Sequence, residues 1–158
     1  MEILKYEKEI ARDCGTFLEE KGYKVKEDTY GLEYEKDGVC IFVFFDLRDG
    51  CSIVEIRFPN NRRWFDIGRI ASVRSGLKQD SGEMVNNVIV LMDYLKRNYD
   101  KITDYNYCKE SRRLIHEEFI MNKEKYKKAV VKFLEKNGGV NIDVDASIED
   151  IINNWKDE

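Results

Sequence analysis

The chain has 158 residues, of which 42% are hydrophobic and 12% aromatic, so its composition excludes an intrinsically disordered protein and suits a single domain, residues 1–158, with its own core. Charged residues make up 37%, well above the usual quarter, yet the formal net charge is only −4. This balance excludes an overall basic field and argues against nucleic acid as a partner, while a local basic patch stays open.

The first predicted element is an N-terminal helix that ends before Gly22, a residue placed where glycine caps a helix C-terminus. Its apolar stripe consists of Ile3, Ile10, Cys14 and Phe17, with Leu4, Ala11 and Leu18 beside them. The charged start predicts no signal peptide, and the longest apolar run, VCIFVFF, is too short to cross a bilayer. The four cysteines form no CxxC pair, which is typical of reduced thiols. We therefore expect a cytoplasmic protein without a membrane partner.

The middle of the chain predicts an antiparallel β-meander. Asp-Gly pairs at 37–38 and 49–50 separate three extended runs, and such pairs are the strongest short-range signal for two-residue type I′ hairpins. The pairs expected beside the two turns are Lys36–Val39 and Arg48–Cys51. A shorter strand at residues 23–26 is expected as a fourth member of the sheet.

This register places apolar residues on one face of the sheet and a mixed set on the other. The apolar cross-strand rows are Tyr34–Ile41–Phe58, Leu32–Val43–Ile56 and Tyr30–Phe45–Val54. The mixed face carries Glu33, Phe42, Phe44, Asp46, Ile53, Glu55 and Arg57. Because Phe42 and Phe44 need either a covering helix or a partner, we expect a helix on each side of the sheet, in three layers.

Helices are predicted after the sheet. Residues 81–102 repeat apolar positions at helical spacing, and so do residues 108–133, with Asn122 as a point of interruption. The alternating residues 141–145 predict a short strand, and Ser147 with Asp150 resembles a capping box that opens a last helix through Trp155. The fold class is therefore α+β: a meander of three or four strands, an N-terminal helix and two or more C-terminal helices.

Most standard catalytic and cofactor motifs are missing from the sequence. His116 is the only histidine, which excludes an HExxH zinc site, and neither a GxGxxG nor a P-loop motif occurs. The aspartates around residue 143 do not form an EF-hand loop, because Ala146 and Ile152 stand where glycine and glutamate are required. We expect no cofactor.

One catalytic alternative stays open, a metal-dependent nuclease that uses Asp46 and Glu55. Such nucleases place an aspartate on one strand and E-x-K on the next, and Glu55 opens an E-x-R sequence here. The expected register makes Asp46 and Glu55 diagonal neighbours about 7 Å apart, close enough to share a metal ion. Against this hypothesis, Arg57 stands where lysine is needed, and arginine is a poor general base.

The arginine-rich segment 57–76 also has two interpretations. Its guanidinium groups and rings resemble a nucleic-acid-binding surface, so a nucleic-acid-binding accessory protein is a third functional hypothesis. In the other interpretation, Pro59 predicts a turn, and Trp64 with the following aliphatic residues has spacings that suit burial. We favour a connector in which Asp66 begins a helix as its N-cap. Arg62 and Arg63 at the turn remain candidates for partner contacts.

The pattern as a whole resembles a loose group of small uncharacterised bacterial α+β proteins of the polymorphic-toxin immunity type. The resemblance covers about the first two thirds of the chain and consists of GYKV, the meander YGLEYEKDGVCIFVFFDLRDGCSIVEI, then WFDIGRI and VNNVIVLMDYLKRNYDKI. It implies a protein partner, a toxin, and it carries over no functional residue. We therefore favour a non-enzymatic cytosolic binding protein, specifically an immunity protein that neutralises a toxin by occlusion. Its expected partner-binding residues are Phe42, Phe44, Glu55, Arg57, Arg62 and Arg63.

Overall fold

The computed structural model describes residues 4–79 and 83–136, in two units, residues 1–111 and 112–158, each described here by itself. The single domain over residues 1–158 stays a prediction. The expected strand and helix at 141–155 lie outside the described residues. The elements are α1 (Lys5–Cys14), α2 (Thr16–Glu20), β1 (Lys24–Glu27), β2 (Gly31–Lys36), β3 (Val39–Asp46), β4 (Cys51–Arg57), β5 (Phe65–Asp66), α3 (Ile67–Ser75), α4 (Met84–Arg97), α5 (Tyr99–Ile102), α6 (Tyr105–Met121) and α7 (Lys123–Lys136).

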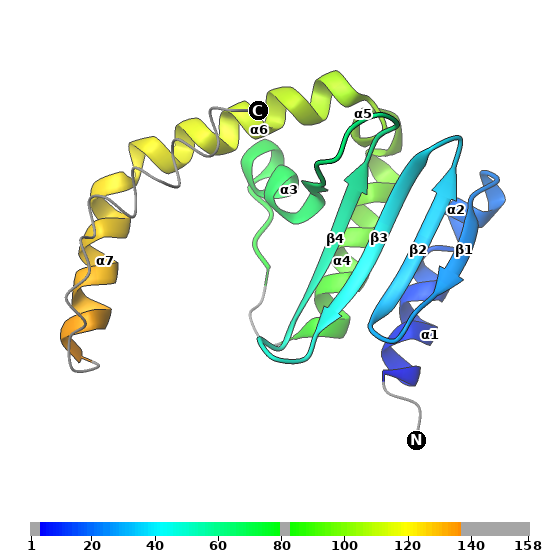
Figure 1. Cartoon of the computed structure of the whole chain (residues 1–158), viewed down its shortest axis with the longest axis horizontal. Helices are drawn as coiled ribbons and strands as arrows, with labels where there is room; N and C mark the ends of the chain where they lie inside the picture. Colours follow the sequence, from blue (N-terminus) through cyan, green and yellow to red (C-terminus); the bar gives the residue numbers. More distant parts are fainter. Residues whose placement is uncertain (1–3, 80–82, 137–158) are drawn as a thin grey trace. The chain divides into compact units, whose positions relative to one another are not determined.

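The first unit contains one antiparallel sheet in the order β1-β2-β3-β4-β5 (Figure 1). The α+β class is confirmed, and the expected fourth strand at 23–26 corresponds to β1. The short β5 was not expected. It arises because the chain returns after Pro59 and pairs Phe65 with Ile56 before α3 begins.

The first hairpin has the predicted turn. Asp37 and Gly38 have φ angles of 52° and 83°, as a type I′ turn requires, and Lys36 pairs with Val39. The carboxylate of Glu35 accepts a hydrogen bond from the Gly38 amide at 2.9 Å. The pairings of β2 with β3 therefore follow the sequence expectation.

The second hairpin differs from the prediction by two residues. Asp46 pairs with Cys51, and residues 47–50 form a four-residue turn instead of a two-residue one. The Asp46 carboxylate accepts hydrogen bonds from the amides of Arg48 and Asp49 at 2.9 and 3.3 Å, and such a bond pattern competes with the tighter turn. A shift of two residues keeps every side chain on its face but changes its partners. The rows become Ile41–Ile56, Val43–Val54 and Phe45–Ser52.

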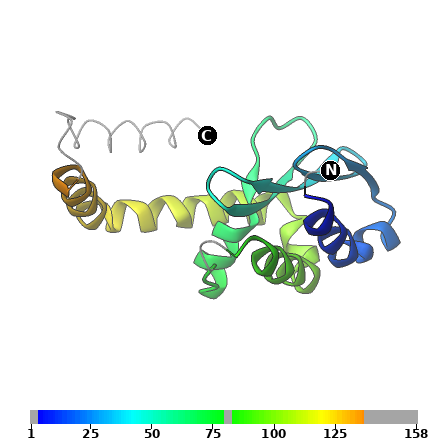
Figure 2. The ribbon, with the colours of Figure 1, turned by 90° about the horizontal axis from the view of Figure 1, so that it is seen from below.

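The core lies between one face of the sheet and the helices α1, α3 and α4, as Figure 2 shows from below. We call this the inner face. Its largest fully buried side chains from the strands are Leu32, Tyr34, Ile41, Phe45 and Ile56, and α4 adds Leu91, Met92 and Leu95. Tyr30 was expected on this face but is 45% exposed, because β2 begins only after it at Gly31.

The N-terminal helix is broken at a position that the periodicity does not reveal. A Cβ atom on Gly15 would lie within van der Waals radii of the buried Tyr34 hydroxyl, so the close approach of helix and sheet requires glycine there. Gly15 is also the residue that separates α1 from α2. Gly22, with a φ of 95°, follows α2 in the capping position that was predicted.

The helices after the sheet agree with their predicted positions. Asp66 is the N-cap of α3, since its carboxylate accepts a hydrogen bond from the Arg69 amide at 3.1 Å. The helix predicted at 81–102 is divided into α4 and α5, and Asn122 separates α6 from α7 as expected. The expected three layers are not found within the first unit, where α1, α3 and α4 all lie on the inner side (Figure 2).

The described part of the second unit, residues 112–136, contains the end of α6 and all of α7. It includes Met121, the most exposed large hydrophobic residue of the described chain at 85%, together with exposed Ile120, Val130 and Val131. Within the described residues, no helix has both the length and the apolar composition needed to span a membrane.

Candidate functional site

The candidate site is the face of the sheet opposite the core, which we call the outer face. In Figure 1 this face of β2, β3 and β4 is turned to the viewer, and no helix from the described part of the first unit lies in front of it. Strand alternation decides its membership, because each of its residues neighbours inner-face residues along the strand. The members on β2 to β5 are Glu33, Glu35, Cys40, Phe42, Phe44, Asp46, Cys51, Ile53, Glu55, Arg57 and Asp66.

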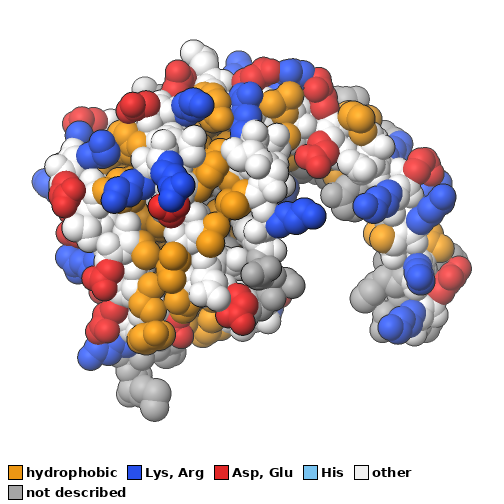
Figure 3. All heavy atoms as spheres, turned by 180° about the vertical axis from the view of Figure 1, so that it is seen from behind, with side chains coloured by type: hydrophobic (Ala, Val, Ile, Leu, Met, Phe, Trp, Pro, Cys, Tyr) orange, Lys and Arg blue, Asp and Glu red, His pale blue; other side chains and the backbone are white. Residues whose placement is uncertain are grey.

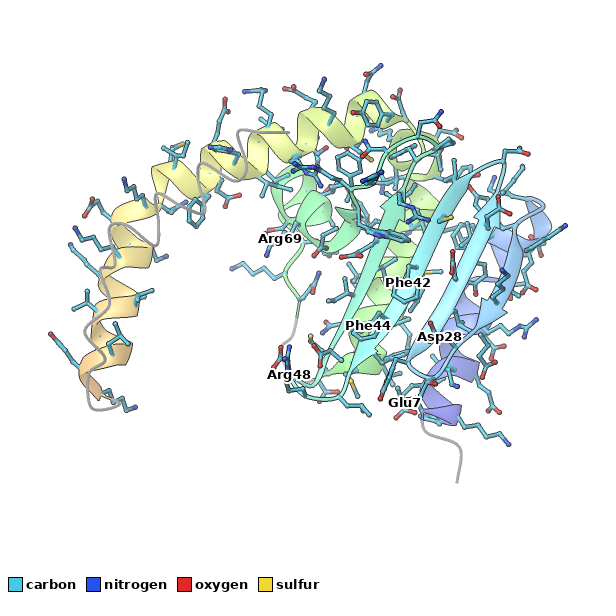
Figure 4. All side chains as sticks on the ribbon, in the orientation of Figure 1. Glu7, Asp28, Phe42, Phe44, Arg48 and Arg69 are labelled. Carbon is cyan, nitrogen blue, oxygen red and sulfur yellow. The ribbon has the colours of Figure 1, made fainter. Side chains whose placement is uncertain are left out.

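Aromatic rings gather at the centre of the outer face. Phe42 and Phe44 stack with ring centroids 5.8 Å apart, and they lie next to each other on β3 in Figure 4. Trp64 lies 5.8 Å from Phe42, and Tyr30 lies 6.1 Å from Phe44. We call these four residues the aromatic patch. Each is partly or largely exposed, so the patch presents apolar area to its surroundings.

Arg57 is held beside this patch. Its guanidinium carbon lies 4.7 Å from the centroid of the Trp64 ring, within the range of a cation–π interaction. A guanidinium nitrogen also donates to the Cys40 sulfur at 3.9 Å. The Arg57 side chain is thus directed toward Trp64 and Cys40, and no ion pair joins it to a carboxylate among the described residues.

The sequence interpretation of Trp64 as a core residue is wrong. Phe65 is buried on the inner side, and Trp64 is partly exposed against Phe42 on the outer face. Consecutive residues of an extended chain point to opposite faces, so only one of these two rings can enter the core. This alternation could have indicated that Trp64 and Phe65 point to opposite faces, but the segment was interpreted as a connector and not as a strand.

A row of acidic residues crosses the outer face through the aromatic patch. Phe42 pairs with Glu33 on β2 and with Glu55 on β4, and Glu55 pairs in turn with Asp66 on β5. Burial, and secondarily the charge of Asp66, raises the pKa of the Glu55 carboxyl above its ordinary value. The environment on the outer face therefore destabilises the ionised form of Glu55 relative to the neutral form.

The other two carboxylates of the row have a cationic side chain as a neighbour. Glu33 pairs with Lys26 across β1 and β2, and Asp66 lies 3.8 Å from the Arg69 guanidinium while it caps α3. No ion pair joins Glu55 to a cation among the described residues. Glu55 thus differs from the other two in having no cation opposite it, since its cross-strand neighbours are Phe42 and Asp66.

The pairing expected for a nuclease site, Asp46 beside Glu55, is not found. With Asp46 opposite Cys51, Glu55 lies four residues further along β4, about 13 Å away, and the row of Phe44 and Ile53 comes between them. Asp46 instead accepts the turn amides and lies 3.6 Å from Arg48, which Figure 4 labels at the β3–β4 turn. Within residues 4–79 and 83–136, no group of three His, Cys, Asp or Glu side chains could hold a metal ion.

The structure groups four of the six expected partner-binding residues. Phe42, Phe44, Glu55 and Arg57 share the outer face. Arg62 and Arg63 are exposed in the connector after Pro59, where the Arg63 amide donates to the Asn61 side chain at 2.9 Å. Ile53 lies on this face as the sequence predicted, although it was not among the expected partner-binding residues, whereas the positions of Tyr30, Trp64 and Asp66 on this face were not predicted.

The helical side of the same unit offers a second apolar area. Figure 3 looks onto this side, where hydrophobic side chains form a strip bordered by charged ones. The exposed large hydrophobic residues of α1 and α4 are Tyr6, Ile89 and Val90. They are aliphatic or single aromatic side chains, and no ring cluster comparable to the aromatic patch joins them in the described residues.

Comparisons with protein-family models, with curated proteins and with solved structures found no match to this chain.

Proposed function

We propose that this chain is a non-enzymatic binding protein that docks a protein partner on the outer face of its sheet. The observation that carries the proposal is the aromatic patch, four rings gathered on a face that no described helix of the first unit covers. Clustered aromatic side chains with an arginine beside them are the composition typical of binding hot spots in protein interfaces. A partner would remove from water the apolar area that the fold leaves accessible.

Single-stranded nucleic acid is the competing occupant of such a face. Two phenylalanines at alternate positions of a central strand can stack bases, as sheet platforms in RNA-binding domains do. Here, however, Phe42 lies between the carboxylates of Glu33 and Glu55, with Asp66 next in the row. These carboxylates repel a phosphate backbone; of the cations on this face, Arg57 is engaged with Trp64, and Lys26 lies opposite Glu33 on β1, at the edge of the sheet. The charge pattern favours a protein.

The specific form that we propose is an immunity protein acting in the cytoplasm, which occludes a toxin. Its support is the sequence resemblance together with the acidic balance of the chain, since inhibitors of basic enzymes are commonly acidic. In this form the outer face would cover the partner's active surface, and the protein itself would need no catalytic group.

A co-expression experiment with a matched control tests the proposal. The chain is expressed with the product of a neighbouring reading frame, and cell growth is scored together with co-purification of the two proteins. The Phe42→Ala/Phe44→Ala variant should lose rescue and at least tenfold in affinity, because it removes the centre of the patch. The control, Ile89→Ala/Val90→Ala, removes two exposed apolar side chains from the helical side and should behave as wild type.

Two results would contradict protein docking on the outer face. One is full rescue by the Phe42→Ala/Phe44→Ala variant while the helical-side control fails. The other is tight binding of single-stranded RNA oligonucleotides in fluorescence anisotropy, lost in the same double variant, which would assign the patch to base stacking.

A further inference from the structure

We propose that Glu55 and Phe42 form a subsite on the outer face that recognises an arginine of the docked protein segment, next to an apolar side chain of that segment on the aromatic patch. This inference rests on the proposed function and names the chemistry of the partner. Three observations support it. Glu55 lies among aromatic rings, no ion pair joins it to a cation in the described residues, and the chain already stacks two of its own arginines on rings.

The position comes from the register of the strands. Glu55 lies on β4 directly opposite Phe42, so their Cβ atoms are about 5 Å apart on the same face. Ile53 precedes Glu55 on this face of β4. Trp64, the residue before β5, lies against Arg57, which follows Glu55 on the same face. A side chain from a partner that covers Phe42 and Ile53 would therefore bring its neighbours within reach of the Glu55 carboxylate.

The charge argument separates Glu55 from the other carboxylates of its row. Glu33 faces Lys26 and Asp66 faces Arg69, whereas Glu55 is partly buried with Asp66 as its closest charged neighbour on β5. A charge without a cationic neighbour across the strands gains more from an incoming cation than a charge that already has one. A partner would also exclude water from the pair, which strengthens a charge-assisted hydrogen bond.

The geometry favours arginine over other cations. A guanidinium group can stack on the face of an aromatic ring while it donates hydrogen bonds to a carboxylate, because it is planar and carries several N–H donors. The chain itself holds two arginines against ring faces, Arg57 over Trp64 at 4.7 Å and Arg74 over Tyr107 at 4.3 Å, and Arg57 also donates to the Cys40 sulfur. In the second case the Arg74 Nε–H also donates to the Ser111 hydroxyl at 2.9 Å. The Glu55–Phe42 pair offers a ring together with a carboxylate, which is a stronger acceptor for a guanidinium group than a sulfur or a hydroxyl.

Peptide display on the full chain tests the subsite with random sequences as the probe. The displayed peptides are selected on the wild-type protein and counter-selected on Phe42→Ala/Phe44→Ala. We expect the selected peptides to combine an aromatic or aliphatic residue with an arginine. The tightest of them should lose about tenfold in affinity for Glu55→Gln and less than twofold for Glu33→Gln, which changes the carboxylate on the other side of Phe42.

A double-mutant cycle then assigns the contact. Replacing the peptide's arginine by citrulline should weaken binding to wild type by about tenfold and should cause no further loss in Glu55→Gln. Peptides that depend on Phe42 and Phe44 but bind Glu55→Gln as tightly as wild type would overturn the arginine subsite and leave protein docking intact. Selection that yields no peptide dependent on Phe42 and Phe44 would overturn the proposed function itself.

Discussion

The two faces of the sheet are built from the same strands and similar side chains, but one forms the core and the other is partly exposed. On the inner face, Phe45 is completely buried under the helices, while its neighbour Phe44 on the outer face stacks on Phe42 in partial contact with solvent. Both faces are rich in aromatic residues, so hydrophobicity alone does not distinguish core from surface here. The difference is that, in the described part of the first unit, helices cover only the inner face.

Truncation of two adjacent phenylalanines provides the largest test of this comparison. Phe45→Ala should lower the free energy of unfolding by about 3–5 kcal/mol, because it leaves a cavity in the core. Phe44→Ala should lower it by no more than about 1 kcal/mol, since the ring is only partly buried. Urea denaturation monitored by tryptophan fluorescence measures both. Similar losses for the two variants would mean that the outer face is part of the folding core.

A smaller effect is expected inside the core, at Tyr34. Its hydroxyl is buried without a hydrogen-bond partner among the described residues, and burial strongly raises the pKa of this phenol. Tyr34→Phe removes a polar group that the inner face does not satisfy, so we expect the free energy of unfolding to rise by up to about 1 kcal/mol. A loss of stability in the same urea titration would show that the hydroxyl has a partner in solution, such as a bound water.

The smallest effect is expected at Glu55, where it depends on pH. Folding raises the pKa of this carboxyl, so its ionised form is less stable in the folded protein than in the unfolded chain. Wild-type stability therefore falls as pH rises from the unfolded pKa, about 4.3, through the higher folded value. Glu55→Gln should match wild type below about pH 4 and exceed it at pH 7 by less than about 1 kcal/mol.

Thermal unfolding of the two proteins across that pH range measures the gap between them. A gap that is the same at low and neutral pH would contradict the role assigned to the charge of Glu55. Combined with the expected loss of peptide binding, a gain in stability would identify Glu55 as a residue that serves binding at the expense of folding.

The hairpins show how far local sequence signals reach. The same Asp-Gly dipeptide forms a type I′ turn at Gly38 but only the end of a four-residue turn at Gly50, because the Asp46 carboxylate binds the turn amides. The predicted faces survived this difference, since a shift of two residues preserves alternation. The predicted neighbours did not, and with them the proximity of Asp46 to Glu55 was lost.

By itself, the sequence determined the fold class, the first hairpin, the N-cap at Asp66 and the face on which Phe42, Phe44, Glu55 and Arg57 lie. These depend on period-two alternation and on hydrogen bonds between residues close in the chain. The tertiary structure alone decided the glycine break at Gly15, the outward position of Trp64 and the pairing of Glu55 with Asp66. Each of these depends on an approach between segments distant in sequence, and periodicity assigns a residue to a face without specifying what packs against it.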